Sequence, residues 1–409
     1  MKALYYIVSF MFLLMSCSHA NRNDTHKMKL EETLSSLSAD ANKKGRATWM
    51  AIDRDYKYPS KTICLEDIAD VRYIPLETTD ASLIQGIHRL ATSDDRIVIC
   101  DAAQNSIFLF DQKGKFISTF NRKGMGPQEY LSIYNFAVDF QEEEIYICDQ
   151  LQKGRMAVYS FDGKFIRDFR FSQKIWPSVL YNYDNNFLIA YDIYQKQGNI
   201  FPNERPYLLI NKTNGEITPL PLQINHRKSN GYTFVEGDKY LSATINIEPM
   251  IKTNDGVVIS DFALDTIYNY KSHQLNAVGV RKGFGSNDLS AYTAYSDNYG
   301  LFVRYKKIVD TKSKYVTSLE SNYFLINNKE NSSLCEIKLY LSDLTGSENI
   351  RWDCYKNDLY KEGVSFCFNV DLLFTLLEKG RLKGKLKTMV ELLEEDANPV
   401  LMIAEFKNN

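Results

Sequence analysis

The chain has 409 residues, of which 44% are hydrophobic and 13% aromatic, and this is enough apolar material for a large buried core. An intrinsically disordered chain is therefore excluded. The formal net charge is −2 and Lys and Arg form no long basic run, so the electrostatic footprint of a nucleic-acid-binding protein is missing. The 27 Tyr and 23 Phe favour β-structure, because aromatic side chains pack well on pleated surfaces.

The first 16 residues have the features of a targeting segment. Lys2 supplies the charged start, and residues 3–15 form an apolar stretch that is too short to span a bilayer. The segment ends in Leu14-Met15-Ser16-Cys17, which resembles a bacterial lipobox. The resemblance implies cleavage before Cys17 and acylation of that cysteine, and two or more acyl chains anchor a protein stably. The alternative is an ordinary secretory signal with a chance cysteine.

The residues after Cys17 bear on where the protein is held. Ser18 rather than Asp follows the cysteine, which in lipoproteins of this type favours the outer membrane. No acidic run follows, so we expect the protein to face the periplasm rather than the cell surface. Residues 17–58 are predicted to be the lipidated cysteine and a polar tether, and residues 59–409 the folded domain.

A unit of short strands recurs along the chain. Residues 94–120 predict three strands: apolar runs at 97–100 and 107–110, and a third at 116–120 after a hairpin turn. Ile99-Cys100-Asp101 recurs as Ile147-Cys148-Asp149, and Val257-Val258-Ile259-Ser260-Asp261 begins another copy. A period of roughly 40 to 70 residues with three or four short strands in each unit is typical of a β-propeller.

We therefore predict an all-β protein with a six-bladed β-propeller. A leucine-rich stretch at 371–395 has helical spacing and predicts a short helical insertion, broken near Gly380 and Gly384, before a final strand at 400–406. A strand at 71–76 is expected to pair with this final strand and close the ring. The predicted blades are residues 85–120, 135–171, 176–222, 245–280, 298–350 and 351–406.

The remaining cysteines are interpreted through the repeats. Cys100 and Cys148 occupy equivalent places in two units, about one repeat apart, which is beyond the roughly 7 Å between Cα atoms that a disulfide allows. Both are predicted to be small buried hydrophobic residues. Cys354 and Cys367 are left open: they either face each other on a hairpin as a disulfide or are free thiols.

Several segments together resemble a known family, the six-bladed, NHL-like β-propeller lipoproteins common in gut-dwelling Gram-negative anaerobes. The resemblance covers about residues 60–406 and implies an exported propeller without implying a particular reaction. Family members usually have Gly where Asn121 stands and often at Gln128. The matching segments are the lipobox at Cys17 and residues 71–78, 93–97, 111–116, 122–130 and 398–401.

The glycine-rich loop at 122–130 is the first candidate site. Backbone amides of such a loop, with Arg122 and Lys123 beside them, can cradle an anion. A phosphate loop, however, is followed by a helix, whereas here a strand follows, and the loop is echoed at 281–285. We therefore interpret it as a connector between blades, with Arg122, Glu129 and Tyr130 as candidates to face a central cavity.

Aspartates at equivalent positions are the second candidate site. Asp101, Asp149, Asp192 and Asp261 each follow an apolar run. Asp commonly caps a turn, and this is the favoured interpretation. The alternative is that these carboxylates surround the channel and bind a divalent cation, because hard cations prefer carboxylate oxygens.

No catalytic motif is present. The five histidines show no zinc-binding spacing, and there is no nucleophile elbow, so no cofactor is predicted. We expect a non-enzymatic binding or scaffold module for a glycan, a peptide or an envelope protein. The alternative is a hydrolase or lyase with its active site at the central channel.

Lipidation at Cys17 can be tested directly. Replacing the thiol with a hydroxyl in Cys17→Ser removes the acceptor of the acyl chain, so labelling of the protein with radioactive palmitate should be lost. Cys64→Ser, expressed and labelled in the same way, should be labelled like the wild type. Persistent labelling of Cys17→Ser would refute the anchor.

Overall fold

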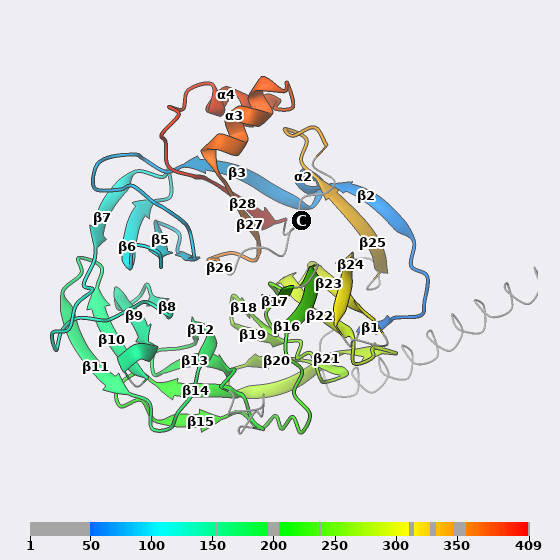
Figure 1. The fold of residues 1–409 in the computed structure, drawn as a ribbon, viewed down its shortest axis with the longest axis horizontal. Helices are drawn as coiled ribbons and strands as arrows, with labels where there is room; N and C mark the ends of the chain where they lie inside the picture. The colour runs from blue at the N-terminus through cyan, green and yellow to red at the C-terminus, as the bar shows by residue number, and fades with distance from the viewer. Residues whose placement is uncertain are drawn as a thin grey trace, which may run out of the picture.

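The computed structural model describes residues 50–407 except 153, 195–203, 237–238, 311–314, 328–332 and 347–356. The predicted signal segment at 1–16, Cys17, the tether before residue 50 and Cys354 therefore lie outside the described residues. Within them, six β-sheets are arranged as a ring around a common axis (Figure 1). This arrangement is a β-propeller, as the repeats predicted.

The first three blades follow the predicted boundaries closely. Each is an antiparallel meander of four consecutive strands, and the first gains β26 (Asn357–Asp358) beside its inner strand β4. The strands are β4 (Arg89–Thr92), β5 (Arg96–Asp101), β6 (Ser106–Asp111) and β7 (Phe116–Phe120); β8 (Asn135–Asp139), β9 (Glu144–Asp149), β10 (Arg155–Ser160) and β11 (Phe165–Arg170); and β12 (Pro177–Asn182), β13 (Phe187–Asp192), β14 (Tyr207–Asn211) and β15 (Ile217–Pro219).

The fourth and fifth blades carry additional strands. A hairpin in the connector between the third and fourth blades, β16 (Gly231–Glu236) and β17 (Lys239–Thr244), joins the fifth blade through β24. The fifth blade begins at residue 288 rather than at 298, because residues 288–295 form its inner strand. The strands are β18 (Met250–Thr253), β19 (Gly256–Ile259), β20 (Thr266–Lys271) and β21 (Gln274–Lys282); and β22 (Asp288–Tyr295), β23 (Tyr299–Val309), β24 (Val316–Asn327) and β25 (Ser333–Tyr340).

The predicted count of six blades is wrong, because five blades of four or more strands are found in the described part of the chain. The sixth sheet has three strands, β27 (Gly363–Phe368), β28 (Val400–Phe406) and β3 (Ala69–Pro75). Between β27 and β28 the chain forms two helices instead of further strands, α3 (Val370–Glu378) and α4 (Gly384–Val390). We call the three-stranded sheet the closing sheet.

The two helices lie where the leucine spacing predicted them. Asn369 caps α3 by accepting a hydrogen bond from the amide of Asp371, and Gly380 and Gly384 have positive φ at the break between the helices. Leu373 and Leu386 are fully buried and pack with β28 and β25 in one hydrophobic cluster. The helices therefore cover the closing sheet.

The N-terminal strands form an outer belt. β1 (Met50–Asp53) pairs in parallel with β21, β2 (Ser60–Cys64) pairs in parallel with β25, and β3 pairs antiparallel with β28. Each is the outermost strand of its sheet, so the belt runs along three successive sheets (Figure 1). A short helix, α2 (Leu65–Ile68), links β2 to β3. Residues 50–53, predicted as tether, are thus part of the fourth blade, and the predicted closure by strands 71–76 and 400–406 is confirmed.

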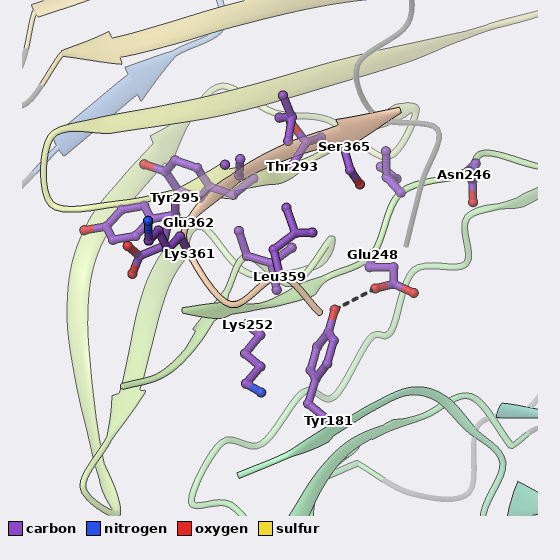
Figure 2. A pocket seen from close by; sticks show the side chains of 16 residues that line it. Tyr181, Asn246, Glu248, Lys252, Thr293, Tyr295, Leu359, Lys361, Glu362 and Ser365 are labelled. Atoms are coloured by element: carbon purple, nitrogen blue, oxygen red, sulfur yellow. Dashed lines mark hydrogen bonds between the residues drawn. The ribbon is translucent and has the colours of Figure 1, made fainter. Parts of the chain in front are cut away.

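Burial explains the sequence pattern of the strands. β5 and β9 are buried along nearly their whole length, because each blade stacks between two neighbours. The outer strand β11 alternates instead: Ile166 is 44% exposed and Phe169 is 7% exposed. Cys100 and Cys148 are completely buried in the middle strands, as predicted. At the axis, side chains from different sheets meet, as Figure 2 shows for Tyr181, Glu248 and Ser365.

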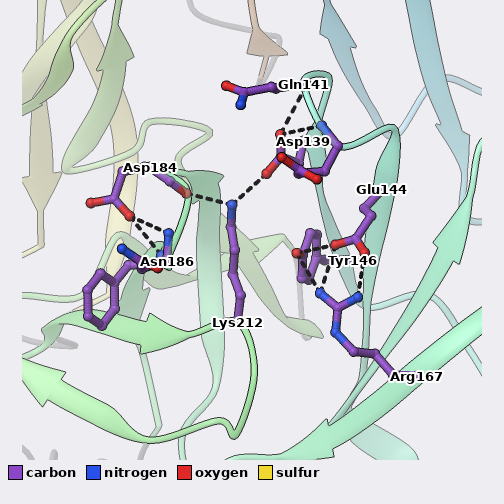
Figure 3. Close-up of polar contacts among 10 residues, drawn as sticks. Asp139, Gln141, Glu144, Tyr146, Arg167, Asp184, Asn186 and Lys212 are labelled. Atoms are coloured by element: carbon purple, nitrogen blue, oxygen red, sulfur yellow. Dashed lines mark hydrogen bonds and ion pairs between the residues drawn. The ribbon is translucent and has the colours of Figure 1, made fainter.

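A buried ion pair joins the second and third blades (Figure 3). Lys212 Nζ lies 2.6 Å from Asp139 Oδ2, and it also donates a hydrogen bond to the Asp184 carbonyl. The two side chains are only 5% and 3% exposed, and the ammonium group lies 5.7 Å from the centre of the Tyr146 ring. Both charges are removed from water, so the stability of each buried charge depends on its ion-pair partner.

Loss of this pair should destabilise the ring. In Lys212→Met the aliphatic stem is retained and the Asp139 carboxylate is left buried without its cation, which costs about 3–5 kcal/mol of unfolding free energy. Urea unfolding followed by tryptophan fluorescence measures the loss. The matched control is Lys164→Met, which removes an exposed ion pair with Asp162 and should leave the unfolding midpoint unchanged. Equal effects of the two variants would contradict the role of the buried pair.

Candidate functional site

A cavity of about 480 Å³ lies at the axis. Its wall is formed by the inner strands β4, β8 and β12 with the chain that enters them, by the chain entering β18, by residues at the ends of second strands and in the turns that follow, and by residues at both ends of the β16–β17 hairpin. In an antiparallel meander the turn after the second strand and the connector that leaves the fourth strand lie at the same end, and we call this end of the ring the connector face. The lining residues are His88, Arg89, Ala102, Ile133, Tyr134, Asn135, Ser178, Val179, Tyr191, Ile193, Lys228, Ser229, Asn230, Gly231, Thr244, Ile247, Glu248, Pro249 and Phe262.

The repeated aspartates hold the backbone around this cavity. In each of the first three blades the carboxylate at the end of the second strand accepts hydrogen bonds from the turn that follows it and from the chain entering the inner strand. The donors are the amides of Gln85, Gly86 and Gln104 for Asp101, of Leu131 and Leu151 for Asp149, and of Trp176 and Tyr194 for Asp192. The carboxylates of these three residues thus tie the turn to the connector.

The fourth aspartate is arranged slightly differently. Asp261 accepts hydrogen bonds from the amide of Ala263 and from the hydroxyl of Tyr207, both at 2.8 Å. Burial raises the pKa of Asp261. No cluster of three or more His, Cys, Asp or Glu that could hold a metal ion occurs among the residues for which the structure gives positions. The aspartate carboxylates accept hydrogen bonds from backbone amides, from the side-chain amide of Gln104 and from the Tyr207 hydroxyl.

The position after each aspartate faces the cavity in three of the four blades. Ala102, Ile193 and Phe262 each follow one of these aspartates directly and line the cavity wall. The aspartate fixes the backbone, and the next side chain shapes the cavity. The size of this next residue differs from blade to blade, from a methyl group to a phenyl ring.

The glycine-rich loop lies elsewhere on the connector face. The Tyr130 side chain is fully buried, accepts a hydrogen bond from the Arg122 amide and donates one to the Asn105 carbonyl. Glu129 Oε2 accepts a hydrogen bond from the Gly126 amide, and the buried guanidinium of Arg155 binds the carbonyls of Pro127 and Glu129. The amides of Arg122 and Gly126 thus donate to side chains of the same loop, and the carbonyls of Pro127 and Glu129 face the Arg155 cation.

None of the three loop residues proposed as cavity residues lines the cavity. Arg122 is exposed and donates from Nε to the Gly163 carbonyl of the second blade, so it contacts a neighbouring turn rather than the axis. The echo at 281–285 shares one hydrogen bond with this loop: the Gly285 amide donates to the Asp288 carboxylate, as the Gly126 amide does to Glu129. Both loops connect one blade to the next.

A buried polar cluster at the cavity wall was not predicted. Arg89 donates from Nη2 to Glu248 Oε1 at 3.0 Å and to the Ser178 carbonyl, and the Tyr181 hydroxyl donates to Glu248 Oε2 at 3.1 Å. Arg89 is 3% exposed, and its Nε and Nη1 groups are buried without an acceptor among the described residues. Burial by itself would lower the pKa of Arg89, but the Glu248 carboxylate raises it above the usual value.

The cluster separates two cavities. Glu248 and Ile247 line both the large cavity and a smaller one of about 70 Å³ between β18, β22 and β27. Figure 2 shows the smaller cavity with the bond between Tyr181 and Glu248 at its edge. Burial and the nearby Glu248 raise the pKa of Tyr181 well above its usual value, so the phenol stays protonated and donates.

Cations surround the other side of the large cavity. Lys228 lines it and donates to the Gly285 carbonyl at 3.0 Å, and burial together with the nearby Arg281 lowers the pKa of Lys228. Arg227 lies over the ring of Tyr191, which is a lining residue, at 5.1 Å from its centre. The wall therefore combines positive charge with aromatic surface.

An aromatic pair stands beside the cavity on the connector face. Tyr134 lines the cavity, and its ring lies edge to face with that of Trp176, with 6.0 Å between the ring centres. Trp176 is 42% exposed, and Ile193 on the cavity wall is 37% exposed. Apolar surface is thus accessible next to the charged groups.

The three histidines of the propeller do not form one site. His88 lines the large cavity, whereas His273 Nε2 lies 2.9 Å from Asp184 Oδ2 and His226 is exposed. Cys367 lies in β27, and Cys354, its candidate partner, is outside the described residues. In the parts of the chain that the structure describes, no helix is long and apolar enough to span a membrane.

Fold and site together define a β-propeller with a central cavity on its connector face. The chain belongs to the DUF4934 family, which is described as a domain of unknown function, and the family profile matches residues 50–405. This range begins at β1 and ends in β28, so the family domain includes the whole belt. No curated protein matches the chain.

Solved structures resemble the fold at low sequence identity. A Bacteroides fragilis protein that is described as exported is 14% identical, with a TM-score of 0.60, and the alignment covers 88% of this chain and 100% of that one. A member of the DUF4221 family from Bacteroides vulgatus is 8% identical, with a TM-score of 0.48 and coverage of 84% and 98%. At such identity, the first similarity supports the fold alone.

The role of the repeated aspartates can be tested at Asp101. Asp101→Ala removes the acceptor of three backbone amides, and a hydrogen bond to a charged group contributes about 1.5–3 kcal/mol, so the thermal midpoint should fall. If the carboxylate only anchors the backbone, the midpoint of the wild type should be the same in calcium chloride and in EDTA. A midpoint that rises with calcium in the wild type and not in Asp101→Ala would instead indicate a cation site.

Proposed function

We propose that the protein is an exported binding module, anchored to the outer membrane through Cys17 and facing the periplasm, which takes a small-molecule ligand in its central cavity. The observation that carries the ligand site is the cavity itself. Its volume of about 480 Å³ falls in the range of roughly 300–1,000 Å³ typical of small-molecule sites. Aromatic and aliphatic side chains make up about half of its wall, and polar or charged side chains make up most of the rest, so the wall offers both apolar contact and hydrogen-bonding groups.

Two observations support export and anchoring. Residues 1–17 have the charged start, the apolar stretch and the terminal cysteine of a lipoprotein signal. The fold is similar to that of a Bacteroides fragilis protein described as exported. The described domain begins at residue 50, so the segment predicted as a tether would lie between the lipidated Cys17 and the first strand of the domain.

The ligand site can be tested by filling it. Ala102 occupies the position that Phe262 occupies in the fourth blade, directly after the repeated aspartate, and both residues line the cavity, so a phenyl ring at this position would extend into the same space. We expect Ala102→Phe to fold normally and to reduce the cavity. Ala102→Ser, which hardly changes the volume, is the matched control.

The readout is the set of small molecules that each protein retains. The full-length wild type, Ala102→Phe and Ala102→Ser are incubated with a small-molecule extract, washed and analysed by mass spectrometry. At least one compound should be enriched by the wild type and by Ala102→Ser and lost from Ala102→Phe. Identical retention by all three proteins would contradict a ligand site in the cavity.

A further inference from the structure

The charge of the cavity wall bears on the kind of ligand. The positively charged residues that line the cavity are Arg89 and Lys228, and the lining carboxylate is that of Glu248. Glu248 already accepts hydrogen bonds from Arg89 and Tyr181. Among the Lys, Arg, Asp and Glu side chains that line the cavity, two cations therefore face one anion, and that anion is engaged.

Arg89 has donor groups left over. Its Nη2 binds Glu248 and the Ser178 carbonyl, while Nε and Nη1 are buried and have no acceptor among the described residues. A buried donor without an acceptor costs about 1–3 kcal/mol, and more on a charged group. Nε and Nη1 lie on different edges of the guanidinium, so each can donate a single charge-assisted hydrogen bond to a carboxylate oxygen.

Groups behind the wall do not cancel this positive charge. Arg227 lies against the Tyr191 ring, and Arg281 is close enough to Lys228 to lower the pKa of the lysine. The acids that act on Lys228 are Asp288, Asp265 and Asp261. Asp288 pairs with Arg304, and Asp261 is bound by the Ala263 amide and the Tyr207 hydroxyl. Among the described residues that line the cavity, the carboxylate is that of Glu248, and it is already paired with protein donors.

We propose that the cavity binds a small organic carboxylate, with the carboxylate group at Arg89, positive potential from Lys228, and the uncharged body of the ligand against Tyr134, Tyr191 and Phe262. This inference rests on the proposed function and specifies its ligand class. Low dielectric inside the cavity strengthens the charge interaction, and the aromatic wall adds apolar contact. A cation or a strongly polar neutral compound would use neither feature.

A pair of matched fluorinated probes tests the charge requirement. Trifluoroacetate and trifluoroethanol share the CF₃ group and differ in charge, so ¹⁹F NMR titration of the full-length protein in detergent at constant ionic strength compares them directly. We expect saturable broadening of trifluoroacetate and a dissociation constant at least about tenfold weaker for trifluoroethanol. Equal binding of the two probes, or no saturable binding of trifluoroacetate, would overturn the inference.

Variants place the binding at the cavity. Lys228→Met and Arg89→Met should each weaken trifluoroacetate binding by roughly tenfold or more, because each removes a charged partner of the anion. Lys123→Met, which removes an exposed cation from the same face, is the control and should bind like the wild type. Arg89→Met leaves Glu248 without its cation and can impair folding. Lys228 makes one hydrogen bond to a carbonyl. If Arg89→Met does not fold, Lys228→Met therefore decides the test. Trifluoroacetate binding that is unchanged in Lys228→Met would contradict the inference.

The failure of this inference can be told apart from failure of the proposed function. Native mass spectrometry of the same samples shows any compound carried through purification, and an acidic compound lost in Ala102→Phe supports the inference. If the compounds retained in the cavity are all neutral and trifluoroacetate does not bind, the cavity is a ligand site of another class. If Ala102→Phe retains the same compounds as the wild type, the ligand site itself is refuted.

Discussion

The rest of the ring depends on the pairing of β3 with β28. Seven residue pairs join the strands, from Ala69 with Phe406 to Pro75 with Val400. Asn398 reinforces the junction, because its side-chain amide donates to the carbonyls of Glu77 and Ser82 and accepts from the amide of Ile84. Without this junction the first and fifth blades would have an exposed face each, and the smaller cavity would lose the wall that β27 supplies.

The belt makes the fold strongly non-local. Residues 50–75 pair with segments between residues 279 and 406, so three sheets are complete only when both ends of the chain are present. Closing such long loops costs conformational entropy before the stabilising contacts form, and proteins dominated by non-local pairing therefore fold slowly. The second and third blades contain only local antiparallel pairs, and the first adds to such pairs only the short parallel pairing of β26 with β4, so these blades can form earlier. Assembly is therefore expected to end with the belt.

Sequence reasoning succeeded where structure is local and repeated. The copies of Ile-Cys-Asp located the first two blades, and leucine spacing located α3 and α4. The predicted number of blades was wrong because of the closing sheet. Its third strand, β3, comes from the other end of the chain, and the local sequence pattern does not distinguish such a sheet from a complete blade. β1 and β2 were missed because short edge strands paired with residues more than 200 positions away leave no local signal. Arg89 and Glu248 were missed for the same reason: each is a single charged residue, and only the ring brings them together.

The repeated aspartates separate the fixing of the backbone from the shaping of the cavity, two requirements that usually compete. Asp101, Asp192 and Asp261 fix the backbone through hydrogen bonds, while the residue that follows each of them borders the cavity and takes no part in that fixing. Substitution at Ala102, Ile193 or Phe262 can therefore reshape the cavity without removing the bonds that hold the turn. A scaffold built in this way can acquire new ligand preferences through single substitutions at little cost to its stability, so the fold is suited to diversification among related proteins.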